Sequence, residues 1–191
     1  LICSDSVGIG TGLAERLRVD GERCGIAWRG ESYDRRGDDE VVIDTQRPDD
    51  FDRLIRDMRP TKGVVHLWSA DEVVDEPTLD QLQAAQDHGC RSVLYLAQAL
   101  ARVRNATPAR LWLVTDKTQP AIAGETVNVA QSPIWGLGKV IAMEHSQLRG
   151  VRIDVETQES ATGRDATCQS IYEGIRLGDG EDQVVFRAGK R

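Results

Sequence analysis

The sequence predicts an α/β fold with a mainly parallel sheet and helices on both of its faces. Short apolar runs rich in β-branched residues alternate with amphipathic helical patterns along the chain. A glycine-rich turn follows the first of these runs and precedes a helical pattern. The run at residues 110–115 (RLWLVT) is almost entirely apolar, as expected for a strand that is covered on both faces. Repeated β-α-β units with right-handed crossovers make the predicted fold Rossmann-like.

The first part of the chain is expected to alternate strands and helices. We predict strands at residues 1–4, 24–28, 41–43 and 63–68, and helices at residues 13–19 and 51–58. Apolar residues at helical spacing indicate the second helix, and Pro60 marks its end. The acidic and polar residues 30–40 are the best candidate for a mobile surface loop.

The rest of the chain continues the same alternation. We predict helices at residues 78–103, 133–143 and 166–177, and strands at residues 110–115, 151–155 and 183–187. Gly89 falls inside the long helix, where it costs about 1 kcal/mol relative to Ala if the helix is continuous. Residues 119–129 are loop-like, and a turn at residues 178–180 leads into the last strand.

Composition and charge exclude several classes of protein. The chain has 191 residues, 24 basic against 31 acidic side chains and a net charge of −7, so it lacks the basic surface of a nucleic-acid-binding domain. No apolar run approaches the roughly 18 residues of a membrane span. We expect residues 1–191 to form a single domain, and the start at Leu1 within an apolar run suggests a fragment of a longer chain.

Cysteine and histidine residues are few and scattered. They lie far apart in the sequence, without a CxxC pair, at Cys3, Cys24, Cys90, Cys168, His66, His88 and His145. This spacing does not favour a metal site, so none is expected. Buried free thiols in a reducing cytoplasm are the simpler interpretation.

The glycine turn at Gly8, Gly10 and Gly12 is the candidate cofactor-binding feature. Glycines at such a turn let the backbone approach a pyrophosphate at the helix N-terminus. The spacing here is G-x-G-x-G, which is looser than a dinucleotide-binding fingerprint, and the alternative is that the turn and its packing need the glycines. Arg29, after the second strand, could reach a ribose phosphate, but the adjacent Trp28 would crowd an adenine pocket.

Residues for hydride-transfer chemistry are missing. A short-chain reductase uses a Tyr as general acid with a Lys four residues later, which lowers the pKa of the Tyr hydroxyl. None of Tyr33, Tyr95 and Tyr172 has such a Lys. Thr115 ends the strand predicted at residues 110–115. A short-chain reductase has its catalytic Ser at this place. We therefore predict no catalytic residue in this chain.

One stretch carries a strong family resemblance. Residues 131–145 (QSPIWGLGKVIAMEH) resemble the Q-x-P-x-W-G-L-G-R-x-x-x-x-E-H-P signature of the structural, N-terminal half of ketoreductase domains in modular type I polyketide synthases. Further segments agree with that family in order and spacing, at residues 1–17, 63–68, 92–100, 111–115 and 181–187. Two positions depart from the signature, since Lys139 replaces the usual Arg and Ser146 the usual Pro.

The resemblance implies a truncated Rossmann-like fold of the short-chain dehydrogenase/reductase type that binds no cofactor itself. In the family, this half packs against a catalytic half that binds NADPH and reduces the β-keto group of a polyketide carried on an acyl carrier protein. The implied partners are that catalytic half and other domains of the same cytoplasmic megasynthase, which makes secondary metabolites such as antibiotics. In the family, the chain continues after Arg191 into the catalytic half, or into an inserted methyltransferase or enoylreductase.

Two alternatives stay open from the sequence. The segment could be the structural remnant of an inactive ketoreductase, serving as a spacer or docking platform. It could also be a stand-alone oxidoreductase that binds a dinucleotide at Gly8, Gly10 and Gly12. On the leading hypothesis, Trp135 and Leu137 are candidates for packing against the catalytic half, although they could equally belong to the internal core.

Overall fold

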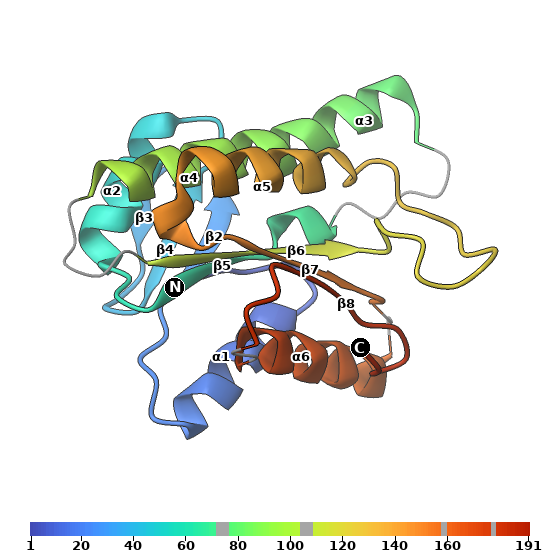
Figure 1. The fold of residues 1–191 in the computed structure, drawn as a ribbon. Helices are drawn as coiled ribbons and strands as arrows, with labels where there is room; N and C mark the ends of the chain where they lie inside the picture. Colours follow the sequence, from blue (N-terminus) through green and yellow to red (C-terminus); the bar gives the residue numbers. More distant parts are fainter. Residues whose placement is uncertain (72–76, 104–108, 158–159, 177–178) are drawn as a thin grey trace.

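An eight-stranded sheet with helices on both faces forms the body of the molecule (Figure 1). The computed structural model describes residues 1–71, 77–103, 109–157, 160–176 and 179–191. The strands follow the order β3-β4-β2-β1-β5-β6-β7-β8 across the sheet. Their bounds are β1 (Ile2–Cys3), β2 (Ile26–Gly30), β3 (Asp34–Arg35), β4 (Glu40–Asp44), β5 (Gly63–His66), β6 (Arg110–Asp116), β7 (Val151–Val155) and β8 (Gln183–Val185).

The topology confirms the predicted Rossmann-like fold. Neighbouring strands pair in parallel, except that β3 pairs antiparallel with β4. Without β3, the order β4-β2-β1-β5-β6-β7 is the 3-2-1-4-5-6 order of Rossmann folds, and β8 extends it. Compared with a full Rossmann fold, the connection between β2 and β4 is shortened. Residues 31–39 are too few for the helix that usually connects parallel strands.

One face of the sheet is covered by α2 (Pro48–Met58), α3 (Leu79–Gln86), α4 (Ser92–Arg102) and α5 (Pro133–Glu144), as Figure 1 shows. Alternate strand residues, among them Ala27, Ile43 and Leu111, are buried against these helices. Phe51 of α2 packs edge-on against Trp68, with ring centroids 6.1 Å apart. This larger cluster is the main hydrophobic core.

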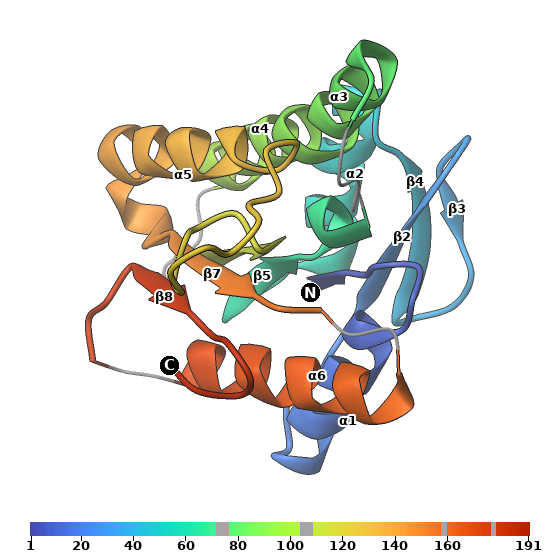
Figure 2. The same cartoon turned by 90° about the vertical axis from the view of Figure 1, so that its right-hand side faces the viewer.

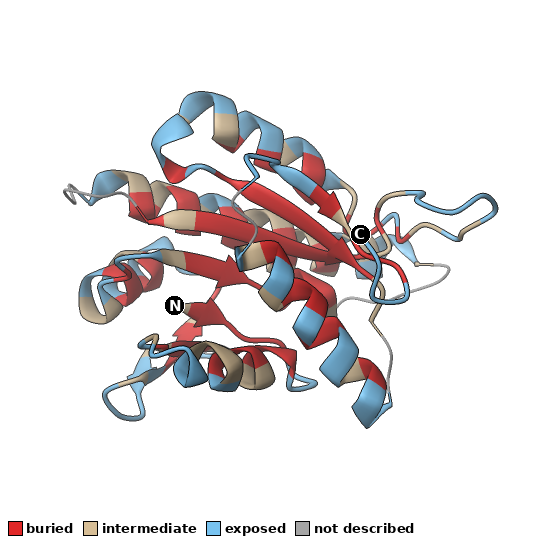
Figure 3. Cartoon of the chain, turned by 60° about the horizontal axis from the view of Figure 1, so that its bottom comes forward, coloured by how far each residue is buried: buried red, intermediate tan, exposed pale blue. Residues whose placement is uncertain are grey.

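The opposite face is covered by α1 (Ile9–Val19) and α6 (Ala161–Arg176), which lie side by side below the sheet (Figure 2). The intervening strand residues, such as Ile26, Trp112 and Ile153, are buried against them. Buried residues form a continuous layer in the strands and along the inner sides of the helices (Figure 3). The predicted cover of helices on both faces is therefore confirmed.

The helix expected over residues 78–103 is continuous but changes its winding at one turn. A capping box at Thr78 begins α3, and a π-helical turn, Asp87–Arg91, joins α3 to α4. A Cβ placed on Gly89 would lie 3.0 Å from Cδ1 of Ile134 in α5. Gly89 thus allows close packing of this turn on α5, at the usual cost of a glycine within a helix.

Several predicted boundaries are wrong in detail. The first helix begins at Ile9 rather than at residue 13, and the last at Ala161 rather than at residue 166. The strand expected over 63–68 ends at His66, because a 3₁₀ turn, Trp68–Asp71, follows it. The second strand is shifted to Ile26–Gly30, and the last ends at Val185. Leu177 and Gly178, expected at the end of a helix and in a turn, lie outside the described residues.

The surface loop predicted at residues 30–40 contains the short strand β3, whose two residues are exposed and pair with β4. The cysteines Cys3, Cys24 and Cys168 are buried and Cys90 is half-buried, and all four are free thiols. Among the helices of the described ranges, none is long and apolar enough to cross a membrane.

Candidate cofactor turn and the carboxyl edge of the sheet

The carboxyl ends of β1, β5, β6 and β7 meet at one edge of the sheet. Rossmann folds bind their ligands at this edge, where the strand order reverses. The glycine turn after β1 lies here, beside the 3₁₀ turn that follows β5 (Figure 2). The side chains at this edge therefore determine whether the chain has a usable cofactor site.

The amides of the glycine turn are occupied by the chain itself. The carboxylate of Asp5, which is 1% exposed, accepts hydrogen bonds from the amides of Val7, Ile9 and Gly10 at 3.1, 3.0 and 2.6 Å. These amides form the N-terminus of α1, where unpaired N–H groups and the helix dipole favour an anion. Asp5 thus supplies the negative charge that a pyrophosphate would bring.

A second carboxylate lies on the other side of the turn. Asp71 accepts hydrogen bonds from the amide and the hydroxyl of Ser6 at 2.9 and 3.1 Å. Its other oxygen accepts a 2.6 Å hydrogen bond from the Arg29 guanidinium. Burial raises the pKa of Asp71, against the opposing effects of Ser6 and Arg29. From the sequence, Arg29 was a candidate to bind a ribose phosphate. In the structure it is paired with the carboxylate of Asp71 in its own chain.

Two of the three glycines of the turn are required by the backbone conformation or by close packing. Gly8 has φ +98°, a conformation that L side chains rarely adopt. A Cβ on Gly10 would lie 2.8 Å from Cβ of Ser4, which allows α1 to approach β1. A Cβ on Gly12 would lie 3.4 Å from the sulfur of Cys168, in ordinary contact with α6. The structural interpretation of Gly8 and Gly10 thus has a direct geometric basis.

His66, at the end of β5, is enclosed and neutral. Its Nε2 lies 2.7 Å from Oγ of Ser92, and Ser92 donates to the carbonyl of Gly89 at 2.9 Å. The imidazole ring is also 5.4 Å from the Trp68 ring in an edge-on arrangement. Burial, reinforced by the charge of Arg29, lowers the pKa of His66 to about 3. A fully buried neutral imidazole held this way is a core residue rather than a base open to a substrate.

Thr115 occupies the position at which the sequence led us to look for a catalytic Ser. It is fully buried, and its hydroxyl donates to the Asp154 carboxylate at 2.6 Å. The same oxygen accepts a 2.9 Å hydrogen bond from the indole Nε1 of Trp135 and lies 2.9 Å from the Thr118 hydroxyl. The hydroxyl is thus engaged within the core, where it fixes Trp135 of α5 against β6.

Trp135 therefore belongs to the internal core. It is only 6% exposed, and Leu137 is partly buried against the same core. The sequence left open whether these two residues pack inside the chain or against another one. The structure assigns Trp135 to the inside, which explains its place in the sequence signature.

A buried ion pair anchors the long loop after β6. Asp154, which is fully buried, accepts hydrogen bonds from the amide and hydroxyl of Thr118 at 2.9 and 2.7 Å and from Arg187 at 2.8 Å. Arg187 also pairs with Glu125 and donates to the carbonyl of Gln119 at 2.8 Å. Arg187, the last residue of the matching segment 181–187 (EDQVVFR, here called the EDQ segment), thus ties the loop at residues 117–129 to the sheet.

The Asp of the EDQ segment has a similar structural role. Asp182 pairs at 2.6 Å with Arg152, whose side chain is almost completely buried, and its carbonyl accepts the Arg152 amide at 2.9 Å. The Arg152 guanidinium carbon lies 6.0 Å from the Trp135 ring. The two sequence motifs of the resemblance meet in the buried hydrogen-bond network in which Trp135 donates to Thr115, and both Thr115 and Arg187 donate to Asp154.

Sequence reasoning found the glycine turn but missed Asp5, Asp71 and Asp154. A possible signal for Asp5 was its place just before the turn, since Asp is favoured where helix amides need an acceptor. Over the described residues, no group of three or more His, Cys, Asp or Glu side chains is placed to hold a metal ion.

Comparisons with known proteins agree with this geometry. The family model described as "Beta-ketoacyl synthase-like, N-terminal" matches residues 16–171. A phenolphthiocerol/phthiocerol polyketide synthase of Mycobacterium tuberculosis is 30% identical over 130 residues, which cover 68% of this chain and 8% of that protein. Pikromycin polyketide synthase component PikAII of Streptomyces venezuelae is 35% identical over 101 residues, covering 52% of this chain and 2% of that protein. The chain thus corresponds to a small part of these relatives.

Solved structures share the fold at low sequence identity. The first ketoreductase of the tylosin polyketide synthase has a TM-score of 0.67 and 22% identity, covering 99% of this chain and 36% of that one. A multidomain structure with adenylation and ketoreductase domains, from a keto acid-selecting module, reaches 0.85 at 18% identity, covering 98% and 16% of the two chains. A short-chain dehydrogenase/reductase from Vibrio parahaemolyticus gives 0.65 at 15% identity, covering 96% and 97%. By the match of the family model over residues 16–171, the chain belongs to the beta-ketoacyl synthase-like N-terminal family, and its fold is that of ketoreductase and short-chain dehydrogenase/reductase domains.

Proposed function

We propose that this chain is a non-catalytic subdomain that stabilises the catalytic half of a polyketide synthase ketoreductase. The observation that carries the proposal is the occupation of the cofactor turn by Asp5, with three amide hydrogen bonds. The buried hydroxyl of Thr115 adds to it, because the position of a catalytic Ser is used for core packing. The parent domain would bind NADPH in its other half and reduce the β-keto group of an acyl chain held on an acyl carrier protein.

The outer side of α5 is the candidate surface for the catalytic half. Val140 is 46% exposed and Met143 is 83% exposed. Gly136 precedes them at helical spacing on the same side, and a Cβ placed on it would meet no atom within 4 Å. Leu94 of the neighbouring α4 is 40% exposed. Exposed apolar side chains grouped on one side of a helix, as Val140 and Met143 are, commonly mark a contact surface between proteins or domains.

The test uses the full synthase that carries this segment, with NADPH-dependent reduction of a β-keto substrate as the readout. Met143→Asp and Val140→Asp are each expected to lower the reduction rate about tenfold or more, because a carboxylate in an apolar interface is costly to bury. Both changes are expected to leave the unfolding midpoint of the 191-residue chain within a few degrees, since the side chains are exposed.

Val19→Asp is the matched control. Val19 is 88% exposed but lies on α1, on the opposite face of the sheet, so this change should not affect reduction. Equal rates in the Met143 and control variants would contradict the proposal. A parent synthase that oxidises no NADPH at all would instead favour the remnant of an inactive ketoreductase.

The four free thiols support a reducing, cytoplasmic location for the parent protein.

A further inference from the structure

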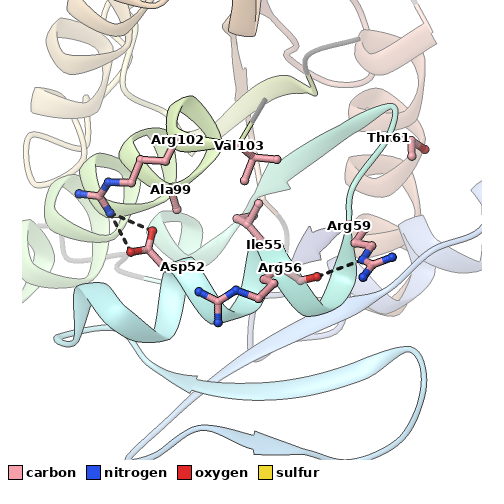
Figure 4. A pocket seen from close by; sticks show the side chains of 8 residues that line it. All are labelled: Asp52, Ile55, Arg56, Arg59, Thr61, Ala99, Arg102 and Val103. Carbon is pink, nitrogen blue, oxygen red and sulfur yellow. Dashed lines mark hydrogen bonds and ion pairs between the residues drawn. The ribbon is translucent and has the colours of Figure 1, made fainter. Parts of the chain in front are cut away.

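A cleft opens at the edge of the sheet opposite the glycine turn, between the C-terminal ends of α2 and α4. Its volume is about 650 Å³. Figure 4 shows the side chains that line it, and the lining residues are Asp52, Ile55, Arg56, Arg59, Thr61, Ala99, Arg102 and Val103. This size is in the range of small-molecule sites in proteins.

The cleft is positively charged although the chain as a whole is negative. Arg102 donates to both oxygens of Asp52, at 2.8 and 2.9 Å, so these two charges are paired. Arg56 and Arg59 have no carboxylate within ion-pair distance among the described residues. Arg59 makes one long hydrogen bond, from Nε to the carbonyl of Arg56 at 3.4 Å, which leaves its terminal nitrogens available (Figure 4).

The backbone at Arg59 is unusual for an arginine. Arg59 is the C-cap of α2 and has φ 44° and ψ 59°, in the left-handed region. Helices often end with this conformation, but the residue there is usually Gly, since a side chain costs about 1 kcal/mol or more. An Arg in this position extends from the end of α2 at the mouth of the cleft, at a cost that Gly would avoid.

The floor of the cleft is apolar. Ile55 is 2% exposed and Ala99 1% exposed, and both belong to the main hydrophobic core, while Val103 is 39% exposed at one side. The cleft therefore combines two available guanidinium groups at its rim with an apolar base. Guanidinium groups bind phosphate and carboxylate through paired, charge-assisted hydrogen bonds.

We propose that this cleft binds an organic oxyanion, a phosphate or carboxylate carried on a small apolar group. Arg59 holds the oxyanion with its terminal nitrogens and Arg56 is a second cation at the rim, while the apolar group lies against Val103, beside the buried Ile55 and Ala99. This site lies away from the glycine turn and is independent of the α5 surface, so the inference does not rest on the proposed function.

Isothermal titration calorimetry of the purified chain tests the site with phenyl phosphate, benzoate, inorganic phosphate and phenol. Phenyl phosphate is expected to bind more tightly than inorganic phosphate because only it can use the apolar floor, and phenol is expected to show no saturable binding. The comparison of phenyl phosphate with benzoate tells which oxyanion the arginines prefer. Raising the salt concentration should weaken binding of both anions.

The decisive variant is Arg59→Gly, which removes the guanidinium and favours the left-handed conformation. It is expected to weaken phenyl phosphate binding about tenfold, the loss expected for one charge-assisted hydrogen bond, while raising the unfolding midpoint. Arg56→Gln should weaken binding to a similar extent. Arg36→Gln, an exposed arginine near β3, removes the same charge elsewhere and should leave the affinity unchanged.

The absence of saturable binding by the unmodified chain would overturn the proposal. So would an Arg59→Gly variant that binds as tightly as the unmodified chain. An equal loss in the Arg36→Gln control would also overturn it, because the anions would then respond to net charge rather than to the cleft.

Discussion

The carboxylate of Asp5 accepts a 2.6 Å hydrogen bond from the amide of Gly10, in the second position of α1. In a dinucleotide-binding Rossmann fold, this end of the helix faces the pyrophosphate. Here a buried side chain of the same chain provides the anion, and it does so for Val7 and Ile9 as well. These three amides are therefore bonded within the chain, and we propose that the Asp5 carboxylate takes the place of a cofactor phosphate.

Replacement of Asp5 by Ala should destabilise the chain. The change leaves three amides at the start of α1 without their acceptor, and Asp5 is buried, so we expect a loss of about 2 kcal/mol in the free energy of unfolding. Urea denaturation followed by circular dichroism measures it. Asp38→Ala, at an exposed carboxylate, should change stability by less than about 0.5 kcal/mol. Similar losses for both variants would contradict the role of Asp5.

Replacing Gly10 or Gly12 of this turn by alanine should change the stability of the chain in different directions. Gly10→Ala forces a methyl group against Ser4 and is expected to cost about 1–3 kcal/mol. Gly12→Ala adds a methyl group in ordinary contact with Cys168 and gains helix propensity, so its effect is expected between neutral and about 1 kcal/mol stabilising. Thermal unfolding of the two variants checks this order, and a more stable Gly10→Ala variant would contradict it.

Mild acid should destabilise the chain through His66. Its pKa is about 3 in the folded state, against an ordinary value of 6.5, because burial disfavours the imidazolium. Below pH 6.5 the unfolded chain therefore binds a proton that the folded chain does not. Stability is then lost as the pH falls, with a slope of up to about 1.4 kcal/mol per pH unit from this residue.

Comparison with His66→Gln isolates this effect. Between pH 6.5 and 5, the unmodified chain should lose stability more steeply than the variant in urea denaturation. The lower starting stability of the variant does not affect the comparison, because only the slopes are compared. Parallel slopes would mean that His66 becomes protonated in the folded chain at mild pH.

Loss of the buried ion pair between Arg187 and Asp154 should lower the stability of the chain strongly. Arg187→Met leaves the fully buried carboxylate of Asp154 without its counter-charge and is expected to cost about 3–5 kcal/mol. Arg191→Met removes an ion pair with Asp179 that is more than a third exposed on both sides, and should cost far less than Arg187→Met because solvent screens this pair. Chemical denaturation of the two variants makes the comparison. A loss below 1 kcal/mol for Arg187→Met would contradict the anchoring role of the pair.

The layout of the fold was predictable from the sequence because the hydrophobic periodicity and the β-α-β alternation define it. β7 matches its predicted range at both ends, and β6 and α5 are each one residue longer than expected. The start of α1 was placed four residues late, because its first turn contains Gly10 and Gly12 and was assigned to the glycine turn, although Ile9 lies four residues before Leu13 on the same buried face. The strand β3 was missed because both of its residues are polar and exposed, so that only pairing with β4 defines it.

The candidate site was predictable only in part. The absence of a Tyr–Lys pair is a property of the sequence, and the glycine turn was found at its true place. That Asp5 turns back onto the helix, rather than toward solvent, depends on its burial in the folded chain. Asp154 and Arg187 are 33 residues apart, and their contact follows from the pairing of β7 with β8, which no local pattern encodes.

A fluorescence titration of NADPH with the purified chain tests most directly whether the glycine turn binds a cofactor. With the amides of Val7, Ile9 and Gly10 bonded to Asp5, and Arg29 bonded to Asp71, we expect no saturable enhancement of NADPH fluorescence at micromolar protein. Saturable enhancement in that range, lost on changing Gly8 or Gly10, would contradict a non-catalytic role and restore the glycine turn as a cofactor site.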